Sequence, residues 1–129
     1  MDILIADKRK DVRYGLAALL EEQYQIKITG EAENFKELIQ SLIRACPDVI
    51  FLSWELPGQK GDTLLKSIRL LCPESLIIVM SSKMEAESLA LALGADHFIS
   101  KAEPPASLYE VMKTYLVEKE PGSEQFRVR

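Results

Sequence analysis

The sequence has few of the residues that build metal and redox sites: among 129 residues there are two cysteines and one histidine. Cys46 and Cys72 each precede a proline, and two separated cysteines are too few for a disulfide framework. We therefore expect free structural thiols and a reducing compartment. A single histidine without a cluster of further ligands makes no metal site, so we expect His97 to lie on the surface of a strand.

An excess of positive charge and long apolar runs are also absent from the sequence. Sixteen Lys and Arg stand against 20 Asp and Glu, for a net charge of -4, which argues against a nucleic-acid or membrane surface. No apolar run approaches the roughly 20 residues of a membrane-spanning helix. The first residues, MDILIADKRK, place their charges after the apolar segment, the reverse of a signal peptide. We expect a cytoplasmic protein with no membrane partner, whose domain does not by itself bind nucleic acid.

Five short apolar runs are present, and they alternate with longer amphipathic segments. The runs span residues 3–6, 26–30, 49–52, 76–80 and 97–99, and runs this short are typical of strands buried on both faces. The segments that follow them carry apolar residues at helical spacing, and Asn34 with Glu37 forms a capping box before the second of these segments. The helical residues expected to face the sheet include Val12, Leu16, Leu20, Leu38, Leu42, Ile43, Leu64, Leu65, Ile68, Leu71, Ala86, Leu89, Ala90, Leu93, Leu108, Val111 and Met112.

This alternation predicts an α/β fold, (βα)5, with a doubly wound, five-stranded parallel sheet. Residues 1–118 are predicted to form one domain. Residues 119–129 lose the periodicity and gain charge, Pro and Gly, which is typical of a C-terminal tail or linker.

Polar residues stand where four of the predicted strands end. Asp7 and Lys8 follow the first run, Ser53 the third, Ser81 the fourth, and Lys101 comes shortly after the fifth. Because the carboxyl ends of parallel strands meet at one edge of a sheet, where α/β proteins bind their ligands, we expect these side chains to be neighbours. Strand ends are also polar simply because they leave the core, and this alternative remains open on spacing alone.

Four segments resemble a known family: ILIADKRKDVRYGL, PDVIFLSWELPG followed by a Gly, IIVMSS, and GADHFISKAEPP. Together they resemble the CheY-like receiver domain of response regulators, especially those of NarL/LuxR-type helix-turn-helix regulators, over residues 1–118. The resemblance implies a flavodoxin-like sheet of strand order 2-1-3-4-5. It also implies a phosphorelay switch, in which an aspartate after strand three accepts a phosphoryl group from a histidine kinase. An acidic pair after strand one then holds Mg²⁺, and a Ser/Thr and a Lys contact the phosphoryl group.

The residues of this chain match that pattern only in part. Asp7 matches the first acidic position, Ser81 the hydroxyl, Lys101 the lysine and Phe98 the switch aromatic. Two positions depart from the family, because Lys8 replaces the second acidic residue and Ser53 replaces the phosphoacceptor aspartate.

The two departures change the charge of the predicted pocket. The family pattern of three carboxylates and one ammonium sums to -2, whereas Asp7 at -1 with Lys8 and Lys101 at +2 gives +1. Glu55 would bring this sum to 0 if its side chain turned inward. The pocket then lacks the net negative charge that attracts Mg²⁺, so we expect no cofactor. A serine nucleophile needs an adjacent base, and His97 is not expected to reach Ser53, so we expect no enzyme activity.

The positions of the cations leave alternatives open. Lys8 either lies between Asp7 and Glu55 as a fixed substitute for the metal or points to solvent. Lys8, Lys101 and the Ser81 hydroxyl could instead hold a free phosphate or sulfate. The basic residues around the first helix, including Arg13, are interpreted as a solvated face.

The favoured interpretation is a degenerate receiver, a pseudo-receiver, that acts through protein–protein interaction. Leu91, Ala92, Tyr109 and Met112 are predicted to lie where the fourth and fifth helices meet, on a surface for a protein partner or a homodimer. Trp54 either anchors a partner or covers the rim of the pocket. The alternatives are a receiver switched by a ligand or by modification of Ser53 or Ser81, and the N-terminal regulatory part of a DNA-binding transcription regulator. A small enzyme on the same scaffold is disfavoured, because no phosphate loop or nucleophile–base pair is present.

Overall fold

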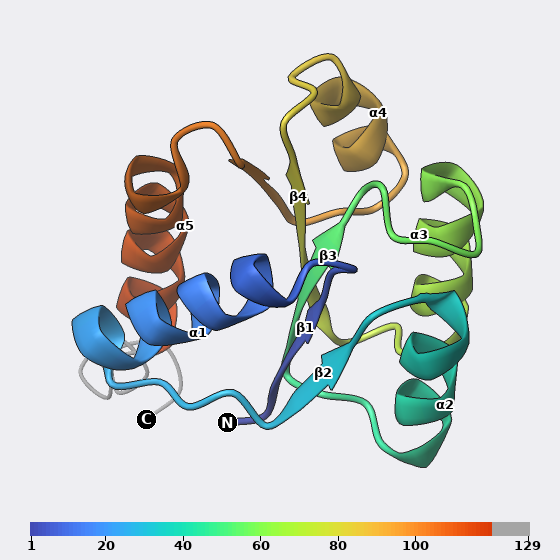
Figure 1. Cartoon of the computed structure of the whole chain (residues 1–129), viewed down its shortest axis with the longest axis horizontal. Helices are drawn as coiled ribbons and strands as arrows, with labels where there is room; N and C mark the ends of the chain where they lie inside the picture. Colours follow the sequence, from blue (N-terminus) through green and yellow to red (C-terminus); the bar gives the residue numbers. More distant parts are fainter. Residues whose placement is uncertain (120–129) are drawn as a thin grey trace.

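The computed structural model of the chain describes residues 1–119, with side chains through Thr114. Strands and helices alternate along the chain (Figure 1): β1 Ile3–Ala6, α1 Lys10–Tyr24, β2 Gly30–Ala32, α2 Phe35–Arg44, β3 Val49–Ser53, α3 Gly61–Leu71, β4 Leu76–Ser81, α4 Ala86–Ala92, β5 His97–Ser100 and α5 Pro104–Lys119. The strands form one parallel sheet of order β2-β1-β3-β4-β5. The predicted fold and strand order are therefore confirmed.

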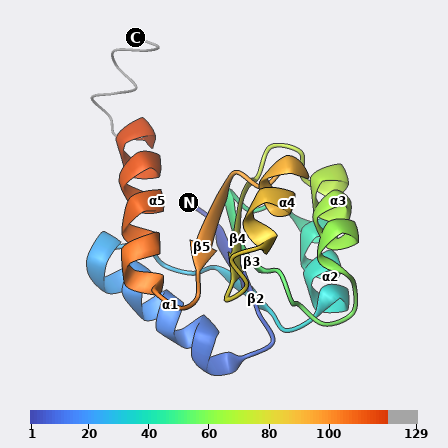
Figure 2. The same ribbon diagram turned by 90° about the horizontal axis from the view of Figure 1, so that it is seen from above.

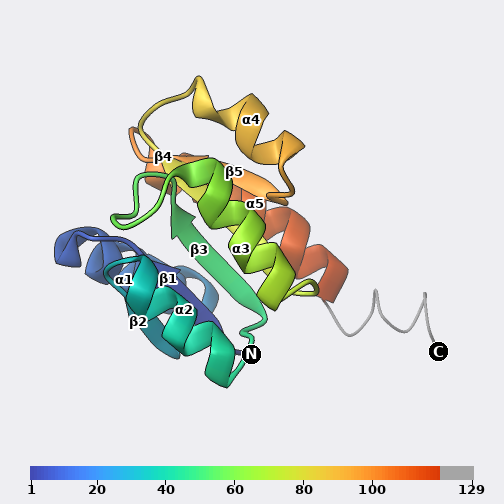
Figure 3. The same ribbon diagram turned by 90° about the vertical axis from the view of Figure 1, so that its right-hand side faces the viewer.

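The helices cover both faces of the sheet. Figure 2 shows α1 and α5 on one face and α2, α3 and α4 on the other, and Figure 3, which looks onto the second face, shows α2 and α3 side by side. Successive strand residues point alternately into two apolar clusters: Ile50 and Leu52 pack with α2 and α3, whereas Val49 and Phe51 pack with α1 and α5. All five residues of β3 are buried, as expected for the central strand of a sheet covered on both faces.

The second strand lies later in the chain than predicted. The apolar run 26–30 is mostly the connection that follows α1, and only Gly30 belongs to β2. The Ile3 N–H donates to the Thr29 hydroxyl at 2.9 Å and the Thr29 N–H donates to the Ile3 carbonyl at 2.9 Å. The paired residues of the two strands begin with Leu4 opposite Gly30. Ile26 is buried against the α1–α5 face of the sheet, which explains why this non-strand segment is apolar.

Three residues predicted to face the sheet are exposed. Ile43, Leu71 and Leu89 have relative exposures of 68%, 40% and 49%. Ile43 and Leu71 lie in the last turns of α2 and α3. In α4, a helix of seven residues, Ala86 and Ala90 at i and i+4 form the buried side, so Leu89 lies beside that side and not on it.

The expectation of two free thiols is wrong for this structure. Cys46 and Cys72 form a disulfide, with their Cα atoms 5.6 Å apart. Each cysteine stands just before one of the neighbouring strands β3 and β4, whose first residues, Val49 and Leu76, are paired in register. In the sequence, the only sign of this disulfide is that a Cys-Pro step precedes each of two strands. The two cysteines become neighbours only because the sheet places β3 and β4 side by side.

The described part of the chain gives no candidate for a membrane span, since none of its helices has the required length and hydropathy. Helix α5 continues through Lys119, one residue beyond the predicted domain boundary. The rest of the predicted tail lies outside the described residues.

We expect reduction of the disulfide to lower the free energy of unfolding by about 3 kcal/mol, because the bond closes a long loop in the unfolded chain. The cysteines are separated by 26 residues. Urea unfolding of the wild type with and without reductant measures the difference. The Cys46→Ser/Cys72→Ser variant is the control and should not respond to reductant. An unchanged wild-type midpoint on reduction would contradict the prediction.

Candidate functional site

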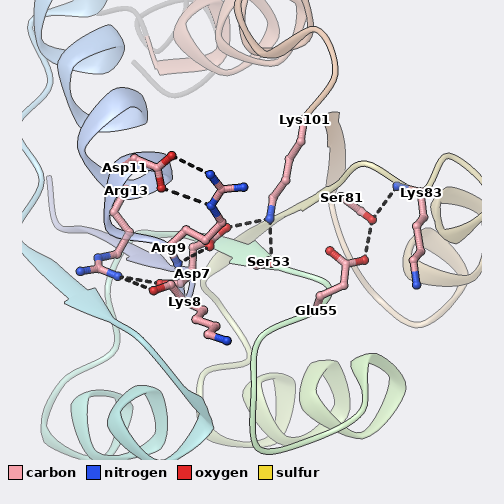
Figure 4. Close-up of polar contacts among 10 residues, drawn as sticks. All are labelled: Asp7, Lys8, Arg9, Asp11, Arg13, Ser53, Glu55, Ser81, Lys83 and Lys101. Atoms are coloured by element: carbon pink, nitrogen blue, oxygen red, sulfur yellow. Dashed lines mark hydrogen bonds and ion pairs between the residues drawn. The ribbon is translucent and has the colours of Figure 1, made fainter.

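The sheet brings the predicted polar residues to one edge, as Figure 4 shows. Asp7 directly follows β1, Ser53 and Ser81 are the last residues of β3 and β4, and Lys101 directly follows β5. Asp7, Ser53 and Ser81 are at most 2% exposed. A buried carboxylate and two buried hydroxyls require polar partners, and these partners define the site.

Lys101 is the cation that neutralises Asp7. Its ammonium lies 2.7 Å from Asp7 Oδ2 and donates to Ser53 Oγ at 3.0 Å. The other carboxylate oxygen, Asp7 Oδ1, accepts the backbone N–H of Arg9 at 2.8 Å. Asp7 Oδ2 is buried without an aligned hydrogen bond, so its contact with Lys101 is best described as an ion pair. The backbone N–H of Lys101 donates to the Ser81 carbonyl, which holds the lysine against the strand ends.

Ser81 faces Glu55 and not Ser53. The Ser81 hydroxyl donates to Glu55 Oε2 at 2.7 Å and accepts the Lys83 backbone N–H at 3.0 Å. Glu55 lies two residues beyond β3 and is exposed. Lys101 and Ser81 thus already have protein partners, and the contacts in this structure do not favour the free-anion site considered from the sequence.

Lys8 does not take the bridging position between Asp7 and Glu55. It is exposed, and its side chain makes no hydrogen bond or ion pair with the side chains and backbone described in residues 1–114. Its backbone carbonyl instead accepts from Arg13 Nη1 at 3.3 Å. In Figure 4 the side chain of Lys8 runs away from Lys101 and Asp7. The solvent-facing alternative describes this structure, and a different lysine supplies the fixed cation.

Arg13 is a residue of this site that the sequence reasoning missed, because it was assigned to a solvated basic face. It is only 6% exposed. Its guanidinium donates to the Asp7 carbonyl at 2.8 Å and to Glu31 Oε1 at 2.6 Å, and it lies 3.6 Å from Glu33 Oε1. The hydrogen bond to Glu31 raises the pKa of Arg13 above its usual value. The signal in the sequence is the acidic pair around β2, which neighbours β1 in the sheet.

The residues at this edge do not fit a magnesium ion. Mg²⁺ needs several oxygen ligands in octahedral geometry, and the described side chains of residues 1–114 include no group of three or more His, Cys, Asp or Glu placed to hold a metal. The buried oxygen of Asp7 faces an ammonium, and the nearby Glu55 accepts from Ser81. A cation here would have to displace Lys101 from its only carboxylate partner among these residues.

The predicted switch and rim aromatics lie on the α2–α3–α4 face. Phe98 and Trp54 are partly buried and pack against that apolar cluster. The Trp54 ring lies over the backbone of Gly61, so close that a Cβ there would sit 2.5 Å from it. This packing agrees with the interpretation of Trp54 as a cover of the rim. The structure shows one position of Phe98, and its role as a switch stays a prediction.

The four predicted interface residues differ in exposure, and three of them lie on the surface. Leu91 and Ala92 are exposed on α4, and Tyr109 is exposed on α5, but these helices lie on opposite faces of the sheet (Figure 2). Met112 is 2% exposed and packs in the α1–α5 cluster, so it cannot contact a partner. Helices α4 and α5 lie on either side of the edge strand β5 (Figure 2), and the use of Leu91, Ala92 and Tyr109 as an interface stays a prediction.

We expect Lys101→Met to lower the free energy of unfolding by about 3 kcal/mol, because it leaves the Asp7 carboxylate buried without its cation. The matched control Lys8→Met removes an exposed ammonium and should change the free energy of unfolding by less than about 0.5 kcal/mol. Asp7→Asn/Lys101→Met should recover most of the loss. Urea unfolding of the variants measures all three values, and equal effects at Lys101 and Lys8 would contradict the assignment.

We expect Arg13→Gln to lower the free energy of unfolding by about 2 kcal/mol, because the Asp7 and Lys8 carbonyls and Glu31 lose a charged donor. Arg9→Gln is the control: the Arg9–Asp11 pair is 68% and 69% exposed and its loss should have almost no effect. Thermal and urea unfolding compare the two variants. An equal, small effect would show that Arg13 does not hold the segment after β1.

Comparison with known proteins identifies the family. Residues 3–113 match the model of the response regulator receiver domain. The chain is 31% identical over 116 residues to the Fimbriae Z protein of Salmonella typhimurium, covering 88% of this chain and 55% of the relative. It is 28% identical to the transcriptional regulatory protein LiaR of Bacillus subtilis, of which it covers 54%. The chain therefore spans about half the length of these two curated relatives.

Solved structures give the same result. A two-component response regulator from Clostridium difficile superimposes with a TM-score of 0.78 at 31% identity, covering 93% of this chain and 98% of that chain. The isolated REC domain of RcsB from Salmonella enterica serovar Typhimurium gives 0.80 at 27% identity, with 89% and 87% covered. With the strand order and the family match in agreement, the chain belongs to the response regulator receiver domain family.

Proposed function

We propose that this domain is a pseudo-receiver, a receiver that acts in signal transduction through protein contacts and without aspartyl phosphorylation. The observation that carries the proposal is the Lys101 ammonium, held by Asp7 at 2.7 Å and by Ser53 at 3.0 Å. The place where family members accept a phosphoryl group is thus filled by a hydroxyl and an internal ion pair.

The charge of the site supports this proposal. Asp7 at -1, Glu55 at -1 and Lys101 at +1 sum to -1, against -2 for the family pattern. The site therefore attracts a hard cation less strongly than the family pattern does. Ser53 is also poorly placed as a nucleophile, because a serine must give its proton to a base, whereas its side-chain partner here is an ammonium that donates to it.

The Glu55 carboxylate takes the place of a phosphoryl group as the acceptor for Ser81. The Ser81 hydroxyl, at the position that contacts the phosphoryl group in the family, donates instead to the Glu55 carboxylate at 2.7 Å. A negatively charged oxygen thus takes the Ser81 hydrogen bond from within the chain. We infer that the site rests in one state that does not depend on a phosphodonor, and that control comes from partner binding or from another part of the protein.

Protein partners are part of the same proposal. Large apolar side chains are exposed in and just before α4, with Met84 at 54%, Leu89 at 49% and Leu91 at 42%, and on the other side of β5 Tyr109 is exposed at 55%. Large exposed apolar side chains that lie near one another are common at protein-binding surfaces. The proposed partners include a second copy of the chain, which would form a homodimer. The cytoplasmic location and the lack of enzyme activity expected from the sequence remain predictions within this proposal.

The alternative with specific support is that the domain is the regulatory part of a longer transcription regulator. It is favoured by the lengths of the relatives, since the chain covers 55% of the Fimbriae Z protein and 54% of the transcriptional regulatory protein LiaR. The chain also covers 35% of a protein-glutamate methylesterase/protein-glutamine glutaminase from Halalkalibacterium halodurans at 31% identity, so receivers of this kind are joined to different outputs. The gene sequence beyond the codon for Arg129 distinguishes these cases.

We expect the wild type to remain unmodified, by intact mass, after incubation with acetyl phosphate and Mg²⁺. The Lys8→Asp/Ser53→Asp variant restores the acidic set of the family and should gain one phosphoryl group. Lys8→Asp alone is the matched control and should stay unmodified. A wild type that gains the group would overturn the proposal. Should the double variant also stay unmodified, the Lys101–Asp7 pair itself excludes the metal.

A further inference from the structure

The disulfide lies at the edge of the sheet opposite to the candidate functional site. Cys46 and Cys72 precede β3 and β4, whereas Ser53 and Ser81 are the last residues of those strands. The two cysteines differ in exposure: Cys46 is exposed, but Cys72 is 1% exposed and belongs to the apolar cluster under α2 and α3. A thiol from solvent can therefore reach the bond from the side of Cys46.

A cavity opens beside Cys46. It has a volume of about 270 Å³ and is lined by Cys46, Ser41, Arg44 and Asp2, among other residues. Arg44 and Asp2 place a positive and a negative group around the same space. In a small thiol that carries carboxylate groups and an ammonium group, a carboxylate can pair with Arg44 and the ammonium with Asp2.

We propose that Cys46–Cys72 is a reversible thiol–disulfide exchange site, opened at Cys46 by a small zwitterionic thiol of the glutathione class. The thiolate sulfur of that molecule forms a bond to Cys46 Sγ, and the bond between the two protein sulfurs breaks. The electron pair leaves on Cys72, which takes up the proton that the incoming thiol released. A second thiol then attacks the mixed disulfide, which frees Cys46 and yields the oxidised disulfide of the small thiol. The reverse sequence closes the bond.

The open state has partners for both cysteines. The Leu71 carbonyl oxygen lies 3.4 Å from Cys46 Sγ, so a reduced Cys46 thiol has an acceptor at hand. Cys72 remains in an apolar cluster, an environment common for a free cysteine. The proposal therefore does not require the chain to unfold when the bond opens.

Contacts beside the disulfide keep the two junctions aligned for closure. The Ser75 hydroxyl donates to the Pro47 carbonyl at 2.6 Å, and the Leu76 N–H donates to the Asp48 carbonyl at 2.9 Å. Neither contact involves sulfur, so both can persist in the open state. The Cα separation of 5.6 Å is the usual one for a disulfide, and the cysteines can re-form the bond without a backbone movement. This site is independent of the proposed function of the opposite edge.

The test is to trap the exchange in the oxidised wild-type chain. The protein is incubated with excess glutathione under native conditions, quenched with acid, alkylated and analysed by peptide mass. We expect one glutathione on Cys46 with Cys72 alkylated, then both cysteines alkylated, and recovery of the bond with glutathione disulfide. Glutathione found on Cys72, or a bond that opens only in urea, would overturn the proposal.

Two single variants test the difference in access. Cys72→Ser keeps the exposed thiol and should react with glutathione disulfide at least about tenfold faster than Cys46→Ser, which keeps the buried one. Equal rates in folded variants would contradict entry at Cys46. If either variant fails to fold, the trapping experiment on the wild type decides.

The ligand class is tested with Arg44→Gln. Its reaction with glutathione should slow by about threefold, the size of one exposed charge interaction, while its reaction with neutral 2-mercaptoethanol stays unchanged. An equal change, or no change, with both thiols would show that the cavity does not recognise a charged thiol.

Discussion

The ion pair between Asp7 and Lys101 is the contact on which the candidate site depends. A carboxylate that is 2% exposed needs a compensating charge, and the ammonium 2.7 Å away supplies it. The same lysine donates to Ser53, and its backbone N–H donates to Ser81. One side chain thus joins the ends of β1, β3 and β5. In a receiver with the usual acidic set, these groups would face a metal and a phosphoryl group.

The parallel sheet explains both edges of the molecule. At the carboxyl ends of its strands it gathers Asp7, Ser53 and Ser81, and at the amino ends of β3 and β4 it gathers Cys46 and Cys72. Neighbouring parallel strands start and end together, so residues 26 apart in sequence meet at one edge. The candidate functional site therefore lies at the carboxyl ends of the central strands, and the disulfide lies at their amino ends. The rigid, doubly covered strands between them keep the two regions apart.

The segment after β1 shows how a buried arginine sets the direction of its neighbours. Arg13 binds the carbonyls of Asp7 and Lys8 and pairs with Glu31. With its backbone held in this way, Lys8 extends into solvent, while Asp7 remains turned toward Lys101. The replacement of an acidic residue by Lys8 thus removes a negative charge from the site without placing a positive one in it, and the positive charge comes from the end of β5.

The alternation of strands and helices, the parallel sheet and the edge where Asp7, Ser53, Ser81 and Lys101 meet could be predicted from the sequence. The reason is that side-chain periodicity is a local property and strands joined by crossover helices are parallel. Tertiary packing was needed to establish which lysine neutralises Asp7, that Arg13 is buried, that Leu89 and Ile43 are exposed, and that Cys46 meets Cys72. Spacing shows the edge or face on which a residue lies. The partner of a long charged side chain, or of a distant cysteine, depends on neighbours that other strands bring in.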